Sequence, residues 1–278
     1  MSIWKKKWVR VLAIVLAVVL VTVGACAIYL GSYYRADMQM VEYFATPTGT
    51  TREVWEDGTV VFVPQNPKTG LIFYPGGKVE HTAYEPLMKS LARSGILCVL
   101  VQMPFRLAVL DMNAADGIQE KFPQIEHWYI GGHSLGGSMA ASYMDKHRDA
   151  FDGLVLLGAY STADLSDSEL SVLSVYGSED GVMNREKYEE CLSNMPADFM
   201  EYVIEGGNHA YFGVYGEQKG DGTALVSHET QILQSALYIG KFLKGWRWEN
   251  SDGKGRWWNV YGAEAHSRVI EAPALSPQ

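Results

Sequence analysis

Apolar and polar segments alternate along the middle of the chain in a way that predicts strands separated by helices. Six short apolar runs are typical of buried strands, and they span residues 70–74, 96–102, 127–131, 153–159, 170–177 and 199–205. Between them lie segments with helical spacing of apolar residues, at 82–95, 111–122, just after 134, 184–194 and 228–245. An earlier segment, 52–64, predicts a hairpin turning at Asp57-Gly58. The alternation predicts an α/β fold with a mostly parallel sheet and helices on both faces.

The longest apolar run lies near the N-terminus and predicts a membrane-spanning helix. Four basic residues at positions 5, 6, 7 and 10 precede an uncharged stretch, 11–34, whose apolar centre at 11–30 is 20 residues long. A helix of that length extends about 30 Å, which matches the hydrocarbon core of a bilayer. The basic cluster predicts a cytoplasmic N-terminus, so the rest of the chain is expected outside.

Two alternatives to an uncleaved anchor involve cleavage. The segment resembles a secretory signal peptide, and Cys26, in the sequence Val-Gly-Ala-Cys, is a possible lipidated residue, so the alternative product is secreted or lipid-anchored. The apolar run, however, continues past Cys26 to Leu30 and is followed by Tyr33, Tyr34 and Arg35. Tyrosines and a cation at this point are typical of a membrane interface, which favours the uncleaved anchor.

Composition and charge narrow the possible partners. The chain has 278 residues, of which 47% are hydrophobic, enough for a sizeable core. Residues 1–10 hold four basic residues and no acidic one, so the remainder carries 19 basic against 32 acidic residues, a net charge of −13. An acidic body without a basic stripe argues against nucleic acid as a partner. The three cysteines form no disulfide framework and no metal-ligand spacing with histidine, so we expect no metal and no cofactor.

These features divide the chain into five parts. They are the basic segment 1–10, the apolar segment 11–34, a linker at 35–51, the α/β domain at 52–245 and a tail at 246–278. The tail holds four tryptophans among glycine, serine and proline and has no sustained periodicity. Its composition fits a segment that packs on the body or the membrane surface and equally a loose one.

Ser134 lies in a Gly-x-Ser-x-Gly motif, Gly132-His133-Ser134-Leu135-Gly136, between the strand 127–131 and a helix. The motif fixes three positions and is expected about 0.1 times by chance in a chain of this length. A sharp strand-to-helix turn would expose the serine hydroxyl as a nucleophile, with glycines where the backbone is crowded. The alternative is a glycine-rich helix start in which Ser134 caps the first turn.

A hydrolytic serine needs a base and a group that orients the base. Asp180 follows the strand 170–177 and His209 follows the strand 199–205. The carboxyl ends of parallel strands meet at one edge of a sheet, so we expect Ser134, Asp180 and His209 to converge there. Asp180 is favoured over Glu179 because an Asp-Gly pair suits the turn that aims a short carboxylate at a histidine.

Several stretches together resemble the α/β-hydrolase superfamily, in its compact group without a cap domain. They are FYPGGKVEHTAYEPL at 73–87, VQMPFRLAVL at 101–110, GGHSLGG at 131–137, YGSEDGV at 176–182 and EGGNHAYFGVYGEQKGDG at 205–222. Together they span most of residues 60–245. The resemblance implies Ser134 as the nucleophile, His209 as the general acid and base, and Asp180 as its orienting partner.

The negative charge that develops on a tetrahedral intermediate requires preorganised N–H donors. Leu135, directly after the nucleophile, provides one such N–H. The second donor is expected in the loop Pro75-Gly76-Gly77-Lys78, with Gly77 as the first choice and Lys78 as the alternative. A plain Gly-Gly turn is compatible with this role.

The hypothesis is a two-step acyl transfer through Ser134 on a small-molecule carboxylic ester. Only residues 160–170 separate two of the predicted strands, and eleven residues cannot form a cap domain, so we expect a shallow, open site for small or exposed acyl esters. Tyr211 and Phe212, beside His209, are expected to line the substrate site; packing beneath the loop is the alternative.

The same three residues serve thioesterases, acyltransferases and peptidases, and a non-catalytic ligand-binding scaffold also stays open. The motifs determine neither the ester nor its leaving group, and they say nothing about the oligomeric state.

Overall fold

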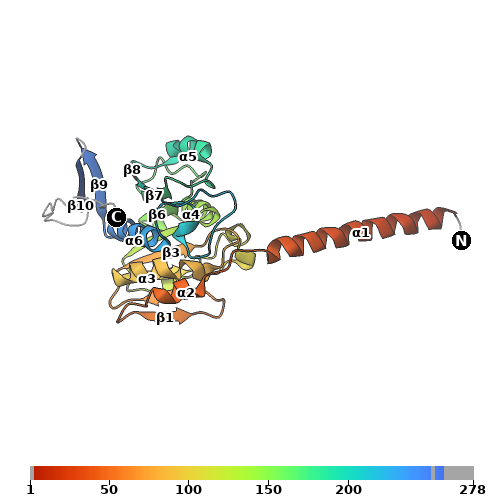
Figure 1. Cartoon of the computed structure of the whole chain (residues 1–278), viewed down its shortest axis with the longest axis horizontal. Coiled ribbons are helices and arrows are strands. Elements are labelled where there is room, and N and C mark those ends of the chain that lie inside the picture. Colours follow the sequence, from red (N-terminus) through yellow and green to blue (C-terminus); the bar gives the residue numbers. More distant parts are fainter. Residues whose placement is uncertain (1–2, 252–253, 260–278) are drawn as a thin grey trace.

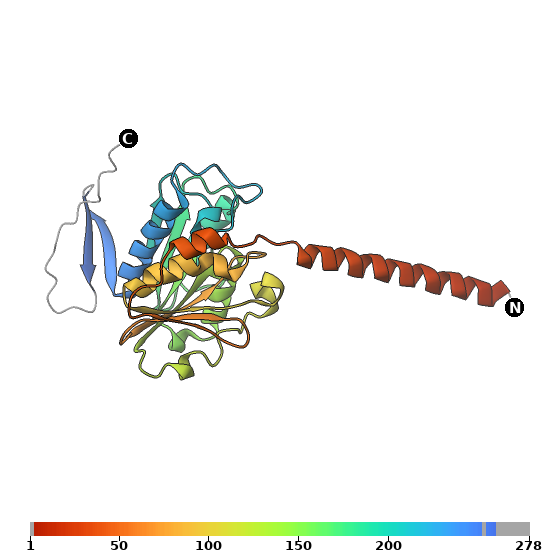
Figure 2. The same ribbon diagram turned by 60° about the horizontal axis from the view of Figure 1, so that its bottom comes forward.

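A computed structural model describes residues 3–251 and 254–259, and shows a sheet flanked by helices, with one long helix projecting from the body (Figures 1 and 2). The sheet has eight strands in the order β1-β2-β4-β3-β5-β6-β7-β8. The strands are β1 Thr51–Val54, β2 Val60–Val63, β3 Thr69–Tyr74, β4 Ile96–Leu100, β5 His127–His133, β6 Gly153–Leu157, β7 Ser171–Gly177 and β8 Asp198–Ile204. Neighbouring strands are parallel from β4, through β3, to β8. At the other end of the sheet, β1 and β2 form an antiparallel edge, with β2 antiparallel to β4.

The pleat of the central strands builds two cores, one on each face of the sheet. In β3, Leu71 and Phe73 face the first core while Ile72 and Tyr74 face the second. Helices α3 (Glu85–Arg93) and α6 (His228–Leu243) cover the first face, and α4 (Leu135–Asp145) covers the second. A further α-helix, α5 (Arg185–Cys191), follows β7. The predicted α/β fold is therefore confirmed.

The six predicted parallel strands lie within two residues of the observed bounds at each end, and the hairpin at Asp57-Gly58 joins β1 to β2. The predicted helix at 111–122 is wrong. That segment is a series of turns ending in the short 3-10 helix η4 (Gln119–Lys121). Gly117 has a φ of +71°, and the Tyr74 hydroxyl donates to Met112 O and accepts from Ala115 N–H. These contacts use backbone groups that a helix would need.

Helix α1 (Ile3–Gly31) projects from the body, and within it Arg10–Gly31 is long and apolar enough to cross a membrane, with a mean hydropathy of 3.0. The helix ends at Gly31, and Tyr34 pairs with Val79 in an isolated parallel bridge. The predicted linker at 35–51 contains the short helix α2 (Met38–Tyr43), whose first turn is capped by the Asp37 carboxylate.

The tail, 246–278, begins as a hairpin in which β9 (Trp246–Ser251) pairs antiparallel with β10 (Lys254–Asn259). The hairpin lies on the side of the body away from α1 (Figure 1). Arg247 is 4% exposed and its guanidinium lies 2.8 Å from the Asp198 carboxylate at the start of β8. This ion pair attaches the hairpin to the sheet. The rest of the predicted tail, 260–278, lies outside the described residues.

Candidate active site

Ser134 occupies the turn between β5 and α4, with a φ of +51° and a ψ of −123°. A non-glycine residue in this region of φ/ψ space is strained, which is typical of functional turns. Neighbouring backbone leaves no room for side chains on either side: a Cβ on Gly132 would lie 2.5 Å from Tyr74 O, and one on Gly136 would lie 2.3 Å from Pro75 O. Close backbone contact therefore requires glycine at both motif positions, as expected for a sharp strand-to-helix turn that presents a serine, and we call this turn around Ser134 the elbow.

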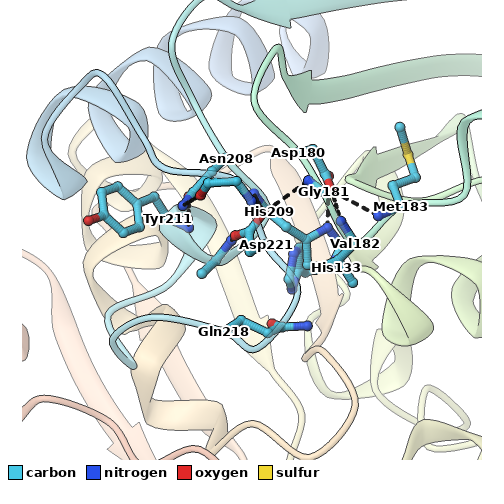
Figure 3. Close-up of polar contacts among 12 residues, drawn as sticks. His133, Asp180, Gly181, Val182, Met183, Asn208, His209, Tyr211, Gln218 and Asp221 are labelled. Atoms are coloured by element: carbon cyan, nitrogen blue, oxygen red, sulfur yellow. Dashed lines mark hydrogen bonds and ion pairs between the residues drawn. The ribbon is translucent and has the colours of Figure 1, made fainter.

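The Asp180 and His209 side chains form a buried pair at the ends of β7 and β8 (Figure 3). The Asp180 carboxylate lies 2.7 Å from His209 Nδ1, and the two side chains are 0% and 1% exposed. The other carboxylate oxygen of Asp180 accepts N–H groups of Val182 and Met183, at 2.9 and 2.8 Å. These contacts fix the carboxylate, which in turn fixes the ring. His209 Nε2 is buried without a hydrogen-bond partner in the described part of the chain.

The serine turn lies beside this pair. Ser134 N–H donates to Leu157 O at 2.9 Å, and the next residue, Gly158, contacts the pair: a Cβ there would lie 2.9 Å from His209 Nδ1 and 3.1 Å from Asp180 Oδ2. On the other side of the serine, the His133 ring centroid lies 4.5 Å from that of His209. The structure thus brings Ser134, Asp180 and His209 together at the carboxyl edge of the sheet.

Asp221 is a part of the site to which sequence reasoning assigned no role. Its carboxylate accepts the backbone N–H groups of His209, Ala210 and Gly181, at 3.1, 2.8 and 3.1 Å (Figure 3). One carboxylate thereby joins the loop that carries Asp180 to the loop that carries His209. The only sequence signal is its place between two glycines in the stretch Gly220-Asp221-Gly222, which reads as an ordinary turn.

His133 was likewise assigned no role, although it lies inside the motif. The side chain is buried, and its Nδ1 lies 2.8 Å from the Tyr84 hydroxyl, which also accepts the Gly76 N–H. Burial, with a smaller contribution from His209, lowers the pKa of His133 well below its ordinary value of 6.5. Burial also raises the pKa of Tyr84, so this pair is neutral near pH 7. A neutral imidazole therefore packs against the His209 ring.

The predicted oxyanion donors lie on two adjacent segments. A Cβ on Gly77 would lie 2.9 Å from Leu135 Cδ2, so the loop after β3 contacts the elbow. Leu135 is the first residue of α4, and its N–H has no acceptor one turn earlier in the helix. The Lys78 N–H, by contrast, donates to Arg106 O at 2.7 Å. That engagement favours Gly77 over Lys78 as the donor from this loop.

Tyr211 and Phe212 do not face the pair. Phe212 is 0% exposed and packs in the first core, with its ring centroid 5.5 Å from that of His133. The Tyr211 ring stacks on His228 at 3.5 Å and points away from His209 (Figure 3). Phe212 thus packs beneath the loop and Tyr211 packs beside it, which favours the packing alternative over a role in lining the substrate site. Residues 158–170 form no helix or strand, so the described chain has no cap at that place.

Within the described ranges, no three His, Cys, Asp or Glu side chains lie close enough together to hold a metal ion.

Comparisons with known proteins agree with this architecture. A family model, described as alpha/beta hydrolase family, matches residues 70–233, which is more than half of the 278-residue chain. No curated protein is similar enough to count as a match. Among solved structures, TT1662 from Thermus thermophilus is 13% identical over 70% of this chain and 98% of its own, with a TM-score of 0.53. Est1E from Butyrivibrio proteoclasticus is 14% identical over 70% and 99%, with a TM-score of 0.48.

Proposed function

Since this chain belongs to the alpha/beta hydrolase family, we propose that it is a serine hydrolase that cleaves carboxylic esters while anchored to a membrane by α1. One observation carries the proposal: the buried Asp180–His209 pair lies beside the strained Ser134 turn, at the edge of the sheet where three separate loops meet. A purely structural serine cap would need neither the strain nor the buried Asp180–His209 hydrogen bond.

The reaction proceeds in two halves. Ser134 Oγ attacks the ester carbonyl while His209 Nε2 accepts its proton, and His209 then returns that proton to the departing alcohol. Water attacks the acyl-enzyme with the same histidine as base, releasing the carboxylic acid and restoring the serine. Asp180 holds Nδ1, which leaves Nε2 available to exchange the proton with Ser134, and it stabilises the imidazolium that forms in each half.

The N–H groups of Leu135 and Gly77 are the proposed donors to the oxyanion. Their fixed backbone lets them meet the developing charge without reorganisation, and losing one such donor costs about 100- to 1,000-fold in rate. Leu135 is held by the first turn of α4, and Gly77 by the contact of its loop with the Leu135 side chain.

The first test measures hydrolysis of p-nitrophenyl butyrate by the full chain in detergent, together with labelling by a fluorophosphonate probe. We expect Ser134→Ala to lose labelling and to lose turnover by at least about 10⁴-fold, because the nucleophile is removed. Ser138→Ala is the matched control: this serine lies one helical turn later and donates to Tyr160 O, at 2.8 Å. It should label and turn over like the wild-type protein.

The same assay decides between the proposal and a binding scaffold. A folded wild-type chain that neither labels nor hydrolyses the ester would disprove catalysis. Labelling with turnover only of a thioester, a peptide or an acyl acceptor other than water would keep the nucleophile and correct the reaction class.

A further inference from the structure

The connection between α1 and the body is short and hydrogen-bonded on both sides. Only Ser32 and Tyr33 separate the end of α1 from Tyr34, whose N–H donates to Lys78 O at 2.8 Å and whose carbonyl accepts the Glu80 N–H at 2.9 Å. Two residues span at most about 7 Å. The outer end of the anchor therefore lies against the loop after β3, the same loop that contains Gly77.

Cations and tyrosines surround this junction. Lys78 Nζ lies 4.1 Å from the Tyr29 ring centroid, and the Arg106 guanidinium lies 3.6 Å from that of Tyr33. Arg35 is exposed beside them. The chain beyond residue 10 carries a net charge of −13, so this group of cations stands out on an acidic body. Tyrosine rings with Lys and Arg suit the headgroup region of a bilayer.

The segment after β4 exposes apolar side chains at the same end. Phe105, Val109 and Leu110 are 57%, 57% and 54% exposed, and we call these three residues the apolar lip. Phe105 and Arg106 line a hollow of about 600 Å³ together with residues of α1, among them Cys26 and Leu30. The lip is thus continuous with the apolar surface of the candidate membrane span.

The lip also borders the candidate active site. Arg106 O accepts the Lys78 N–H at 2.7 Å, and Gly77, the residue before Lys78, contacts the Leu135 side chain. On the other side, the 3-10 helix η3 (Ala108–Leu110) packs against α4, whose N-terminus begins directly after Ser134. Contacts therefore lead from the end of α1, through the segment that carries the lip, to the loop of Gly77 and to α4, the helix that follows Ser134.

From this arrangement we infer that the site opens onto the membrane in which α1 is embedded, and that its substrate is a long-chain carboxylic ester of a lipid in the outer leaflet. The inference rests on the proposed function and names its substrate class. The lip contacts the acyl-chain region, the cations contact headgroups, and the ester reaches Ser134 without leaving the bilayer surface. The open site expected for exposed esters is then open toward lipid rather than toward bulk water.

The test uses the full chain in phosphatidylcholine vesicles with two esters that share one leaving group. 4-Methylumbelliferyl oleate is dissolved in the bilayer, and 4-methylumbelliferyl butyrate is supplied in water. In a first arrangement the oleate ester is in the same vesicles as the protein; in a second it is in separate vesicles. We expect turnover of the oleate ester to be at least about 10-fold faster in the first arrangement, because the anchor holds the site at its own membrane.

The double variant V109Q/L110Q removes most of the exposed apolar surface of the lip and leaves the site residues in place. We expect the ratio of oleate to butyrate turnover in the same-vesicle arrangement to fall at least about 10-fold. L233Q/L237Q is the matched control, because these two leucines are 48% and 49% exposed on α6, away from the lip. Its ratio should equal that of the wild-type protein.

The outcomes separate the inference from the function on which it rests. Equal oleate turnover in both arrangements, or an unchanged ratio in V109Q/L110Q, would overturn the inference while butyrate turnover and serine labelling kept the esterase proposal intact. A full-length protein that neither hydrolyses butyrate nor labels at Ser134 would end both.

Discussion

At the scale of single residues, the site depends on side chains that never touch the reacting atoms. Asp221 is the clearest case, because its two oxygens hold the loops of Asp180 and His209 in one arrangement through backbone N–H groups. A buried or half-buried N–H that loses an ionised acceptor costs more than an ordinary hydrogen bond. Precision at the Asp180–His209 pair therefore depends on a residue that follows His209 in the connection between β8 and α6.

Asp221→Asn should lower kcat/KM for p-nitrophenyl butyrate by about 10- to 100-fold, since an amide nitrogen would replace one of the two accepting oxygens. Asp180→Asn should cost about 10⁴-fold, because it removes the group that sets the histidine tautomer. Asp152→Asn is the control: that carboxylate also accepts a backbone N–H, from Trp128 at 2.8 Å, at the other end of the strands. A loss in Asp221→Asn no greater than in Asp152→Asn would contradict the positioning role.

His133 links the site to the pH dependence of stability. Its pKa is lowered well below 6.5 in the folded protein, so the unfolded chain binds this proton more readily. Stability from this group is complete above about pH 7.5 and is lost as the pH falls below 6.5, by up to about 1.4 kcal/mol per pH unit. Burial also lowers the pKa of His81 and His228, which act in the same direction.

We therefore expect the free energy of unfolding in urea to decline less steeply between pH 7 and pH 5 in His133→Gln than in the wild-type protein. The variant should be less stable at pH 7.5, because it loses the contact with Tyr84. The two slopes are the measurement, since His81 and His228 contribute equally to both. Identical slopes would show that His133 titrates normally in the folded state.

At the scale of elements, the elbow can form because its glycines have no Cβ. Gly136 lies in α4 against Pro75 O and Tyr74 O, each 2.3 Å from where a Cβ would stand. A Cβ on Gly240, in the last turn of α6, would meet no atom of another segment closer than 3.8 Å. Close backbone contact therefore requires glycine at position 136, whereas the space around position 240 would accept a larger residue.

Gly136→Ala should destabilise the protein by at least about 2 kcal/mol and displace Ser134, because backbone atoms cannot yield as a flexible side chain does. Gly240→Ala should stabilise it by about 0.5–1 kcal/mol through the higher helix propensity of alanine. Thermal unfolding and butyrate turnover of the two variants give the comparison. Equal changes in both would refute the steric account of the elbow.

The pattern of apolar residues predicts those elements whose structure is determined by burial of apolar side chains. The strands β3 to β7 are buried almost throughout and β8, at the edge of the sheet, is largely half-buried; all six follow apolar runs and were found within two residues. The segment 111–122 was not, because long-range bonds to the Tyr74 hydroxyl outweigh its helical pattern. Ser134, Asp180 and His209 could be proposed because each follows a recognisable strand. Asp221 and His133 act through contacts between distant segments, which spacing along the chain does not encode.

At the scale of the whole molecule, α1 and the body form one connected object. The helix carries no charged residue between Arg10 and Gly31, and the residues after it join the sheet edge through Tyr34 and Asp37, whose N–H donates to Val214 O at 2.7 Å. The hairpin β9–β10 lies on the opposite side of the body (Figure 2). The candidate membrane span and the hairpin thus lie at opposite ends of the body.

We expect the full chain, expressed in bacterial cells, to remain with the membrane after carbonate extraction and to be digested by protease added outside spheroplasts. The basic residues before Arg10 favour a cytoplasmic N-terminus, so an N-terminal tag should stay protected. Release by carbonate would indicate cleavage after α1. Protection of the body in intact spheroplasts, with digestion after lysis, would reverse the proposed orientation.

The bridge between Tyr34 and Val79 holds the candidate active site close to the end of α1, and this has a consequence for reaction rates on a membrane. With α1 embedded as proposed, a site joined so closely to that helix stays at the bilayer surface and meets bilayer-held substrate only by lateral diffusion, whereas water-soluble esters still reach it from solution. For a substrate held in the bilayer, velocity would follow the mole fraction of that substrate among the lipids. Adding inert lipid would then slow the reaction at constant total substrate, as dilution in two dimensions requires.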